Sequence, residues 1–137
     1  MIHYKQKYHS RLLEMWNSEI LSPLLRIIVF AIASYMMFRY NVILVITEIW
    51  RKRDVDWEAD VHYYWRGIDF RIHNLRFDKE LRIDEAQDLA DWINSWVQYD
   101  PKRPSKKVAY LHGEGAHRHI HLQIHPNTII IAFPIAA

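Results

Sequence analysis

The chain has no cysteine, 3 glycines and 5 prolines in 137 residues. Because cysteine is absent, disulfides and thiolate metal sites are excluded, and any metal ion must be bound by His, Asp or Glu side chains. The same absence is compatible with any redox compartment, so it gives no information on location.

A long apolar run is also missing. Residues 27–38 form an uncharged apolar stretch of twelve residues between Arg26 and Arg39. A bilayer span needs about 20 such residues, so we expect a buried helix here and no stable membrane span. The stretch starts too late for an ordinary signal peptide, and no segment has the pattern of a targeting signal. We therefore expect a protein that is made in the cytoplasm without a signal peptide.

The excess of positive charge is small. The formal net charge is +2 with neutral histidines, which is too small to indicate nucleic acid as a partner. Protonated histidines would make the protein distinctly basic below about pH 6.5. Half of the residues are hydrophobic and 14% are aromatic, which excludes a disordered chain. The length fits one domain with a substantial core.

Helical patterns come first along the chain, and strands follow with one helix between them. Helices are predicted at 8–18, from Ser22-Pro23 to Tyr40, and from Asp84 onwards, where Gln87 completes a capping box. Strands rich in β-branched or alternating apolar residues are predicted at 42–47, 67–72, 108–112 and 119–125. This order predicts an α+β domain.

We find no repeat and no domain boundary, so residues 1–137 are expected to form a single domain. It divides into a helical part (1–40), a part with the motifs (42–125) and an apolar C-terminal arm (126–137). The arm is interpreted as a strand or packed segment, and a homodimer formed through it is the alternative.

Nine histidines are a high count, and three of them alternate in the run HRHIHLQIH. His117, His119 and His121 stand at positions i, i+2 and i+4, which point to one face of a strand. The cluster can therefore present several imidazoles to one point. The alternative, that neighbours satisfy these histidines structurally, stays open.

A second candidate pair is His62 and Asp69, seven residues apart. Asp69 begins an apolar strand, and a carboxylate is costly to bury there unless a cation or a metal ion compensates it. Pairing with Arg66 or Arg71 is the structural alternative. His and Asp together form the ligand set of a zinc site that keeps one position open for water.

We expect His121 to be the partner of this pair on the later strand. It lies between Ile120 and Leu122 and should therefore point away from the core. Gln123 follows on the same face, where it could fix the tautomer of a histidine ligand.

These motifs resemble the LAS-type zinc peptidases, the group of D-Ala-D-Ala carboxypeptidases and L-Ala-D-Glu endopeptidases that includes many phage endolysins. Their first motif has a histidine ligand and, seven residues later, an aspartate ligand, as in HYYWRGID from His62 to Asp69. Their second motif ends in His-x-His on a strand, as in His119-Ile120-His121. Upstream they often carry a Ser/Thr-x-x-Arg turn, which Thr47 to Arg51 resembles with one residue more. The similarity covers residues 42–123 in the same order along the chain.

The chain departs from the family pattern at three positions. Asp60 stands where a serine is usual, and Trp65 stands where a glycine is usual. The catalytic base of the family is commonly an acid three residues before the last ligand, and that residue is Arg118 here. Glu114 stands three residues before His117, so these two residues offer a competing alignment for base and ligand.

The resemblance implies a LAS fold, with a small antiparallel sheet packed against helices. It implies a zinc ion bound by His62, Asp69 and His121, with a water molecule in the fourth position. Glu114 or His119 would be the base, and His117 is a third candidate. The sequence leaves the choice among these three open.

The resemblance also implies the substrate. Arg51 would bind the developing oxyanion or a substrate carboxylate, to which a guanidinium is suited. The substrate would be the stem peptides of peptidoglycan, cleaved by metal-assisted amide hydrolysis in a phage or prophage lysis context. The protein would then act on the bacterial cell wall.

Two other functions fit some of the same residues. His119 and His121 also match the His-hydrophobic-His pair of HUH-type single-strand DNA nucleases, which need a nucleophilic tyrosine. Tyr99 and Tyr110 are weak candidates for that tyrosine, and the nuclease leaves the His62 and Asp69 pair unexplained. A non-catalytic protein of the same fold, with a binding or structural role, is the other alternative.

Overall fold

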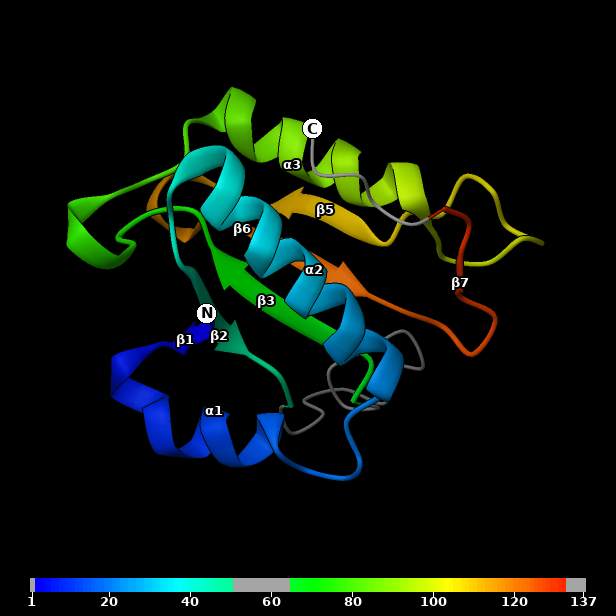
Figure 1. Ribbon diagram of the computed structural model, residues 1–137, viewed down its shortest axis with the longest axis horizontal. Coiled ribbons are helices and arrows are strands. Elements are labelled where there is room, and N and C mark those ends of the chain that lie inside the picture. The colour runs from blue at the N-terminus through cyan, green and yellow to red at the C-terminus, as the bar shows by residue number, and fades with distance from the viewer. Residues whose placement is uncertain (1, 51–64, 133–137) are drawn as a thin grey trace.

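The computed structural model describes residues 2–50 and 65–132 (Figure 1). Within these ranges, three α-helices accompany a mixed five-stranded sheet and a small two-stranded sheet, so the predicted α+β class is confirmed. The helices are α1 (His9–Trp16), α2 (Pro23–Tyr40) and α3 (Ile83–Trp96), with short 3-10 turns η1 (Gln6–Tyr8), η2 (Arg76–Asp78) and η3 (Gly115–His117). The strands are β1 (Ile2–Tyr4), β2 (Leu44–Glu48), β3 (Gly67–Arg71), β4 (Val97–Gln98), β5 (Ala109–His112), β6 (His119–Gln123) and β7 (Ile129–Ile130).

The large sheet has the strand order β1-β2-β3-β6-β5. Strands β2, β3, β6 and β5 pair antiparallel, as the resemblance implies, whereas β1 pairs parallel to β2. A parallel pair needs a long crossover, which α1 and α2 provide between β1 and β2. The sheet is therefore mixed, because a three-residue strand that the sequence pattern does not mark joins its edge.

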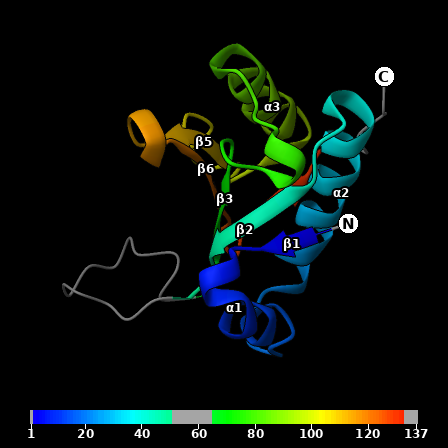
Figure 2. The same ribbon diagram turned by 90° about the vertical axis from the view of Figure 1, so that its left-hand side faces the viewer.

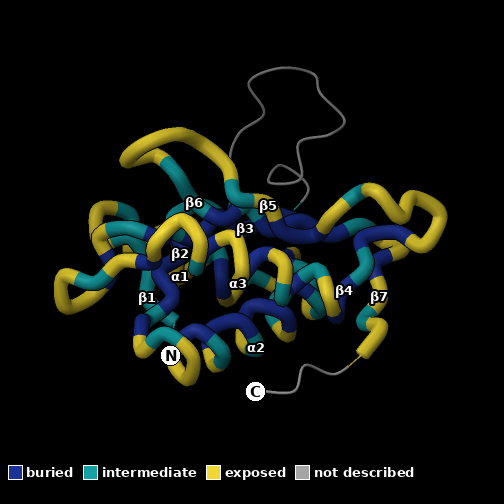
Figure 3. Tube along the Cα trace, turned by 90° about the horizontal axis from the view of Figure 1, so that it is seen from above, coloured by how far each residue is buried: buried dark blue, intermediate teal, exposed yellow. Residues whose placement is uncertain are grey.

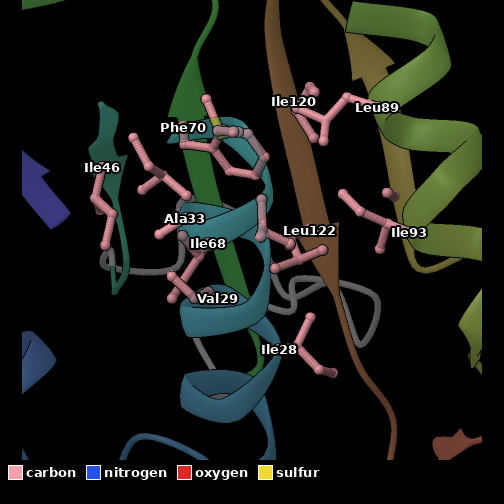
Figure 4. Packing of buried hydrophobic residues seen from close by; sticks show 14 of the residues in the cluster. Ile28, Val29, Ala33, Ile46, Ile68, Phe70, Leu89, Ile93, Ile120 and Leu122 are labelled. Carbon is pink, nitrogen blue, oxygen red and sulfur yellow. The ribbon is translucent and has the colours of Figure 1, made fainter. Parts of the chain in front are cut away.

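Helices α2 and α3 lie on the same side of this sheet, and α1 packs at its β1–β2 edge (Figures 1 and 2). The side chains that β3 and β6 turn toward the helices are Ile68, Phe70, Ile120 and Leu122, and all four are 0% exposed. In Figure 4, Ile68 and Phe70 lie beside α2, and Ile120 lies beside Leu89 of α3. Their burial removes a large apolar area from water, which is the main force that holds helices and sheet together. Figure 3 shows the strands mostly buried and the connecting loops exposed.

The ends of α2 are where the sequence predicts them. Pro23 occupies the first turn, where its missing N–H is not needed. Asn41 ends the helix in the left-handed region, at φ 53°, and its N–H donates to the Met37 carbonyl. Asparagine tolerates this conformation better than most residues, so the sequence signal has a physical cause.

Helix α2 is long and apolar enough to cross a membrane by length and composition, and a third (33%) of its apolar window is buried in the protein. The core helix of a soluble protein has the same properties. The side opposite the sheet leaves Ile27, Phe30 and Phe38 more than half exposed.

The start of α3 differs from the predicted capping box. The helix begins at Ile83, and the Glu85 carboxylate accepts a hydrogen bond from the Arg82 backbone N–H at 3.0 Å. Asp84 lies in the first turn, where its hydrogen bond with Arg82 lowers the pKa of the carboxyl group. Gln87 donates to Asp91 one turn later. The capping box is thus formed by Arg82 and Glu85, because the N-cap lies two residues before Asp84.

Part of the C-terminal arm forms strand β7, which pairs antiparallel with β4. The Ile131 N–H extends this contact by donating to the Trp96 carbonyl at 3.0 Å. Residues 133–137 of the arm lie outside the described residues. The described part of the arm therefore contains a strand, one of the two predicted forms, and packs at the end of α3.

Candidate functional site

The sheet face that points away from α2 and α3 carries polar side chains on three adjacent strands. Asp69 of β3 lies directly opposite His121 of β6, and Arg71 lies opposite His119. On the other side of β6, Tyr110 and His112 of β5 lie opposite the same two histidines. Alternation along the strands therefore places the apolar residues in the core and these residues on the outer face, as predicted.

Asp69 and His121 form the closest polar contact of this face. Nδ1 of His121 lies 2.8 Å from Oδ1 of Asp69, a hydrogen-bond distance at which the imidazole N–H donates to the carboxylate. The two side chains are largely buried, with 11% and 20% of their surfaces exposed. Partial exclusion of water strengthens this contact, because a hydrogen bond to an ionised group becomes stronger as the local dielectric constant falls.

The other ring nitrogen of His121 faces Gln123. Its Nε2 lies 3.3 Å from Oε1 of Gln123, and Nε2 of Gln123 donates to the Lys107 carbonyl at 3.0 Å. The second bond orients the amide, so that its oxygen is the atom turned toward the imidazole. Gln123 therefore makes the contact with His121 that its position on the strand predicts, and it helps to hold the ring in place.

His119 approaches the same carboxylate from its other oxygen. Nε2 of His119 lies 3.7 Å from Oδ2 of Asp69, and Nδ1 contacts the His117 carbonyl oxygen at 2.8 Å. The ring also makes an edge-to-face contact with His112, with 5.4 Å between centroids. Asp69 thus has one histidine near each carboxylate oxygen.

The competing pair of Glu114 and His117 lies on the exposed turn before β6. Among the described residues, no hydrogen bond or ion pair involves the Glu114 side chain. The turn is tight: Gly113 has a φ of 84°, and a Cβ at this position would lie 2.6 Å from the His117 carbonyl oxygen. His73 binds the Gly115 carbonyl at 3.0 Å and so ties the turn to the end of β3.

Two of the predicted site residues, His62 and Arg51, lie outside the described residues. Residue 60, one of the family departures, lies there as well. The outer face of the sheet therefore contains two of the three predicted zinc ligands, Asp69 and His121, together with the candidate base His119.

The Asp69 and His121 pair has suitable chemistry for a zinc site but is not complete by itself. Two ligands of a tetrahedral zinc ion lie about 3.3 Å apart, because each bond is about 2.0–2.1 Å long. The observed 2.8 Å between Nδ1 and Oδ1 is close to that separation. In the ranges 2–50 and 65–132, no group of three or more His, Asp or Glu side chains is arranged to hold a metal ion. A zinc site would need a further protein ligand beyond these two.

Comparisons with protein-family models, with curated proteins and with solved structures find no match for this chain. The chemistry of the site therefore has to be inferred from its own geometry.

Sequence reasoning missed contributions from β2. Glu48 is the register partner of Asp69 at an irregularity in the β2–β3 pairing, and its side chain is 24% exposed. Thr47 donates its hydroxyl hydrogen to the Asp69 carbonyl at 3.3 Å. The sequence did mark both residues, because they belong to the upstream motif from Thr47 to Arg51. Spacing alone, however, does not reveal their register with β3.

Neither Tyr99 nor Tyr110 has the position that the nucleophilic tyrosine of an HUH-type nuclease requires. Tyr99 is 5% exposed and follows β4, away from the large sheet. Tyr110 lies opposite His121, and its hydroxyl oxygen accepts a hydrogen bond from the Lys107 N–H at 2.9 Å. Burial removes Tyr99 from consideration as a nucleophile, and Tyr110 lies on a strand rather than on a helix.

Proposed function

We propose that the protein is a zinc-dependent peptidase of the LAS type that hydrolyses amide bonds in the stem peptides of peptidoglycan. The observation that carries the proposal is the direct contact between Asp69 and His121. These residues come from two motifs 52 positions apart in the sequence, and adjacent antiparallel strands bring them together on the polar face. The antiparallel part of the sheet, from β2 to β5, is the element that we assign to the LAS fold.

The proposed metal site consists of Asp69, His121 and His62. Zinc, when bound, lowers the pKa of water to about 7 and polarises the carbonyl group that is to be cleaved. Gln123 orients the His121 ring through Nε2, so that Nδ1 of His121 and the Asp69 carboxylate, which are hydrogen-bonded to each other, are the atoms that would bind the metal in place of the shared proton. Arg51 is proposed to bind a carboxylate of the substrate or the developing oxyanion.

We assign the role of general base to His119 rather than Glu114. The His119 imidazole lies on the same face as Asp69, 3.7 Å from its carboxylate. Glu114 is exposed on the preceding turn and has no polar side-chain contact with a described residue. The base would accept a proton from the attacking water and deliver it to the leaving amine, which requires it to lie beside the reacting groups.

The remaining parts of the proposal concern context. We infer that the protein acts on the bacterial cell wall, in phage or prophage lysis. Its partner is the peptide of the wall rather than nucleic acid or a membrane. The apolar C-terminal arm is the proposed contact if the protein forms a homodimer.

The function is tested by incubating purified peptidoglycan with zinc-loaded protein, with chelator-treated protein and with a His121→Ala variant. Mass spectrometry should find new peptide termini in the first sample and none in the other two. The new termini identify the bond that is cleaved. Intact peptidoglycan in all three samples, from folded protein, would contradict the proposal, and metal-dependent cleavage of single-stranded DNA by the same protein would favour the nuclease.

The assignment of the base gives a separate prediction. His119→Ala should reduce kcat about 100-fold, the lower end of what a positioned base contributes, and should leave the zinc content unchanged. Glu114→Ala serves as the matched control and should leave kcat close to that of the unchanged protein. Steady-state kinetics and metal analysis of both variants provide the measurement. A large loss with Glu114→Ala and none with His119→Ala would reverse the assignment.

A further inference from the structure

A pocket of about 730 Å³ lies at the edge of the molecule, apart from the Asp69 and His121 contact. Its walls are the N-terminal segment 3–9 and the loop 74–78 before α3, and its floor includes Val45 and Arg71 of the sheet. Both wall segments lie at the left side of Figure 1. This volume is within the range of about 300–1,000 Å³ that is usual for ligand sites. It is larger than a single small ion.

The charge of this pocket is strongly positive. Lys5, Lys7, Arg71 and Arg76 line it, against one carboxylate, Asp78. The pocket therefore has a surplus of three positive charges, whereas the whole chain has a net charge of +2. The remaining charges of the chain nearly cancel, so this surplus makes the pocket a place of positive potential.

Within residues 2–50 and 65–132, none of the four cationic side chains forms an ion pair with a carboxylate. Lys5 and Lys7 lie 5.3 and 5.4 Å from the centre of the Tyr8 ring, and Arg71 donates to the Asn74 carbonyl. These contacts orient the cations and leave their charge uncompensated. Like charges gathered in one pocket repel one another, and a bound anion relieves that repulsion.

Arg76 is held by a histidine. Its Nε donates to Nδ1 of His3 at 2.7 Å. Burial and, after it, the Arg76 charge lower the pKa of His3, so the ring stays a neutral acceptor for this bond near pH 7. The bond uses Nε and leaves the two terminal nitrogens of the guanidinium for an oxyanion, which a guanidinium binds with two parallel hydrogen bonds.

The loop that carries Arg76 has an unusual backbone. Asn74, Phe77 and Asp78 all have positive φ values, at 50°, 62° and 56°. This region is costly for a bulky residue such as Phe77, whose side chain is 82% exposed and gains little from burial. Strained backbone of this kind is concentrated at ligand-binding sites.

We propose that this pocket binds a multiply charged oxyanion, a ligand with several neighbouring phosphate or carboxylate groups. Cations from three separate segments, 5–7, 71 and 76, converge on it, which suits several anionic groups better than one. Arg71 also lies two residues beyond Asp69 on β3, opposite His119. The bound anion therefore lies beside the proposed peptidase site, but its binding requires neither zinc nor hydrolysis.

The test is a calorimetric titration of metal-free protein with tripolyphosphate and, separately, with citrate. Each titration is carried out at low and at moderate salt. At least one ligand should bind saturably, and binding should weaken as salt rises. A ligand that carries phosphate is indicated if tripolyphosphate alone binds, and one that carries carboxylates if citrate alone binds.

The variants compare the loss of two charges in the pocket with the same loss elsewhere. Lys7→Gln with Arg76→Gln should weaken binding at least about tenfold, because two of the charges that attract the anion are removed. Lys102→Gln with Lys106→Gln, in the basic loop far along the chain, should change it little. Circular dichroism verifies that both double variants are folded. The proposal is wrong if neither ligand saturates, or if the two double variants lose affinity equally. Because no hydrolysis is measured, either result is independent of the peptidase assignment.

Discussion

Phe70→Ala should lower the free energy of unfolding by about 3–5 kcal/mol. Among the described residues, Phe70 is the largest fully buried side chain, and it packs between the sheet and α2 (Figure 4). Its register partners are Ile46 on one side and Ile120 on the other, and both are 0% exposed. Removal of the ring leaves a cavity that these short, β-branched neighbours cannot fill by moving.

Chemical denaturation followed by tryptophan fluorescence provides the measurement. The matched control is Phe38→Ala, since Phe38 lies on the outer side of α2 and is 67% exposed. It should change the free energy of unfolding by less than about 0.5 kcal/mol. Equal losses in the two variants would show that the outer face of α2 is covered in solution and that the core of the protein extends beyond it.

The position of Phe70 was predictable from the sequence because a strand alternates strictly. Ile68 and Phe70 stand on either side of Asp69, and Ile120 and Leu122 stand on either side of His121. A period of two sends the apolar residues to the core and the polar residues to the other face. The boundaries of α2 were predictable for an equally local reason, the chemistry of Pro23 and Asn41.

The parts of the fold that sequence reasoning missed depend on contacts between distant segments. Strand β1 has three residues, too few to show a period, and it exists because β2 offers a free edge to pair with. The capping box of α3 was predicted too late, because Gln87 and Glu85 are both acceptable at its third helical position and only the backbone shows which of them caps the helix.

The candidate site was predictable in its members but not in its arrangement. The sequence singled out Asp69, His119 and His121, and it did not indicate that Asp69 faces both histidines. That arrangement follows from the register of β3 with β6, which spacing along one strand cannot define. The participation of Glu48 depends on an irregular pairing and was missed for the same reason.

The other large effect is expected one residue before Phe70. Asp69→Asn should abolish measurable hydrolysis and weaken zinc binding by at least about 10–100-fold. The amide keeps the shape of the carboxylate, and its oxygen still accepts the hydrogen bond from Nδ1 of His121, so the fold should be preserved. The charge that compensates a cation is lost, however, and in the proposed mechanism a base alone does not replace the metal, which lowers the pKa of the attacking water and polarises the carbonyl group.

Zinc content after dialysis, peptide release and the free energy of unfolding are measured on the same sample of the variant. Asp88→Asn is the matched control, because it makes the same chemical change at an exposed position on α3 and should leave all three quantities unchanged. Phe70→Ala and Asp69→Asn therefore separate the two faces of one strand: the first should reduce stability and the second activity. If Asp69→Asn kept its zinc and its peptidase activity, Asp69 would be a structural partner of His121, and the metal site would have to be sought away from β3.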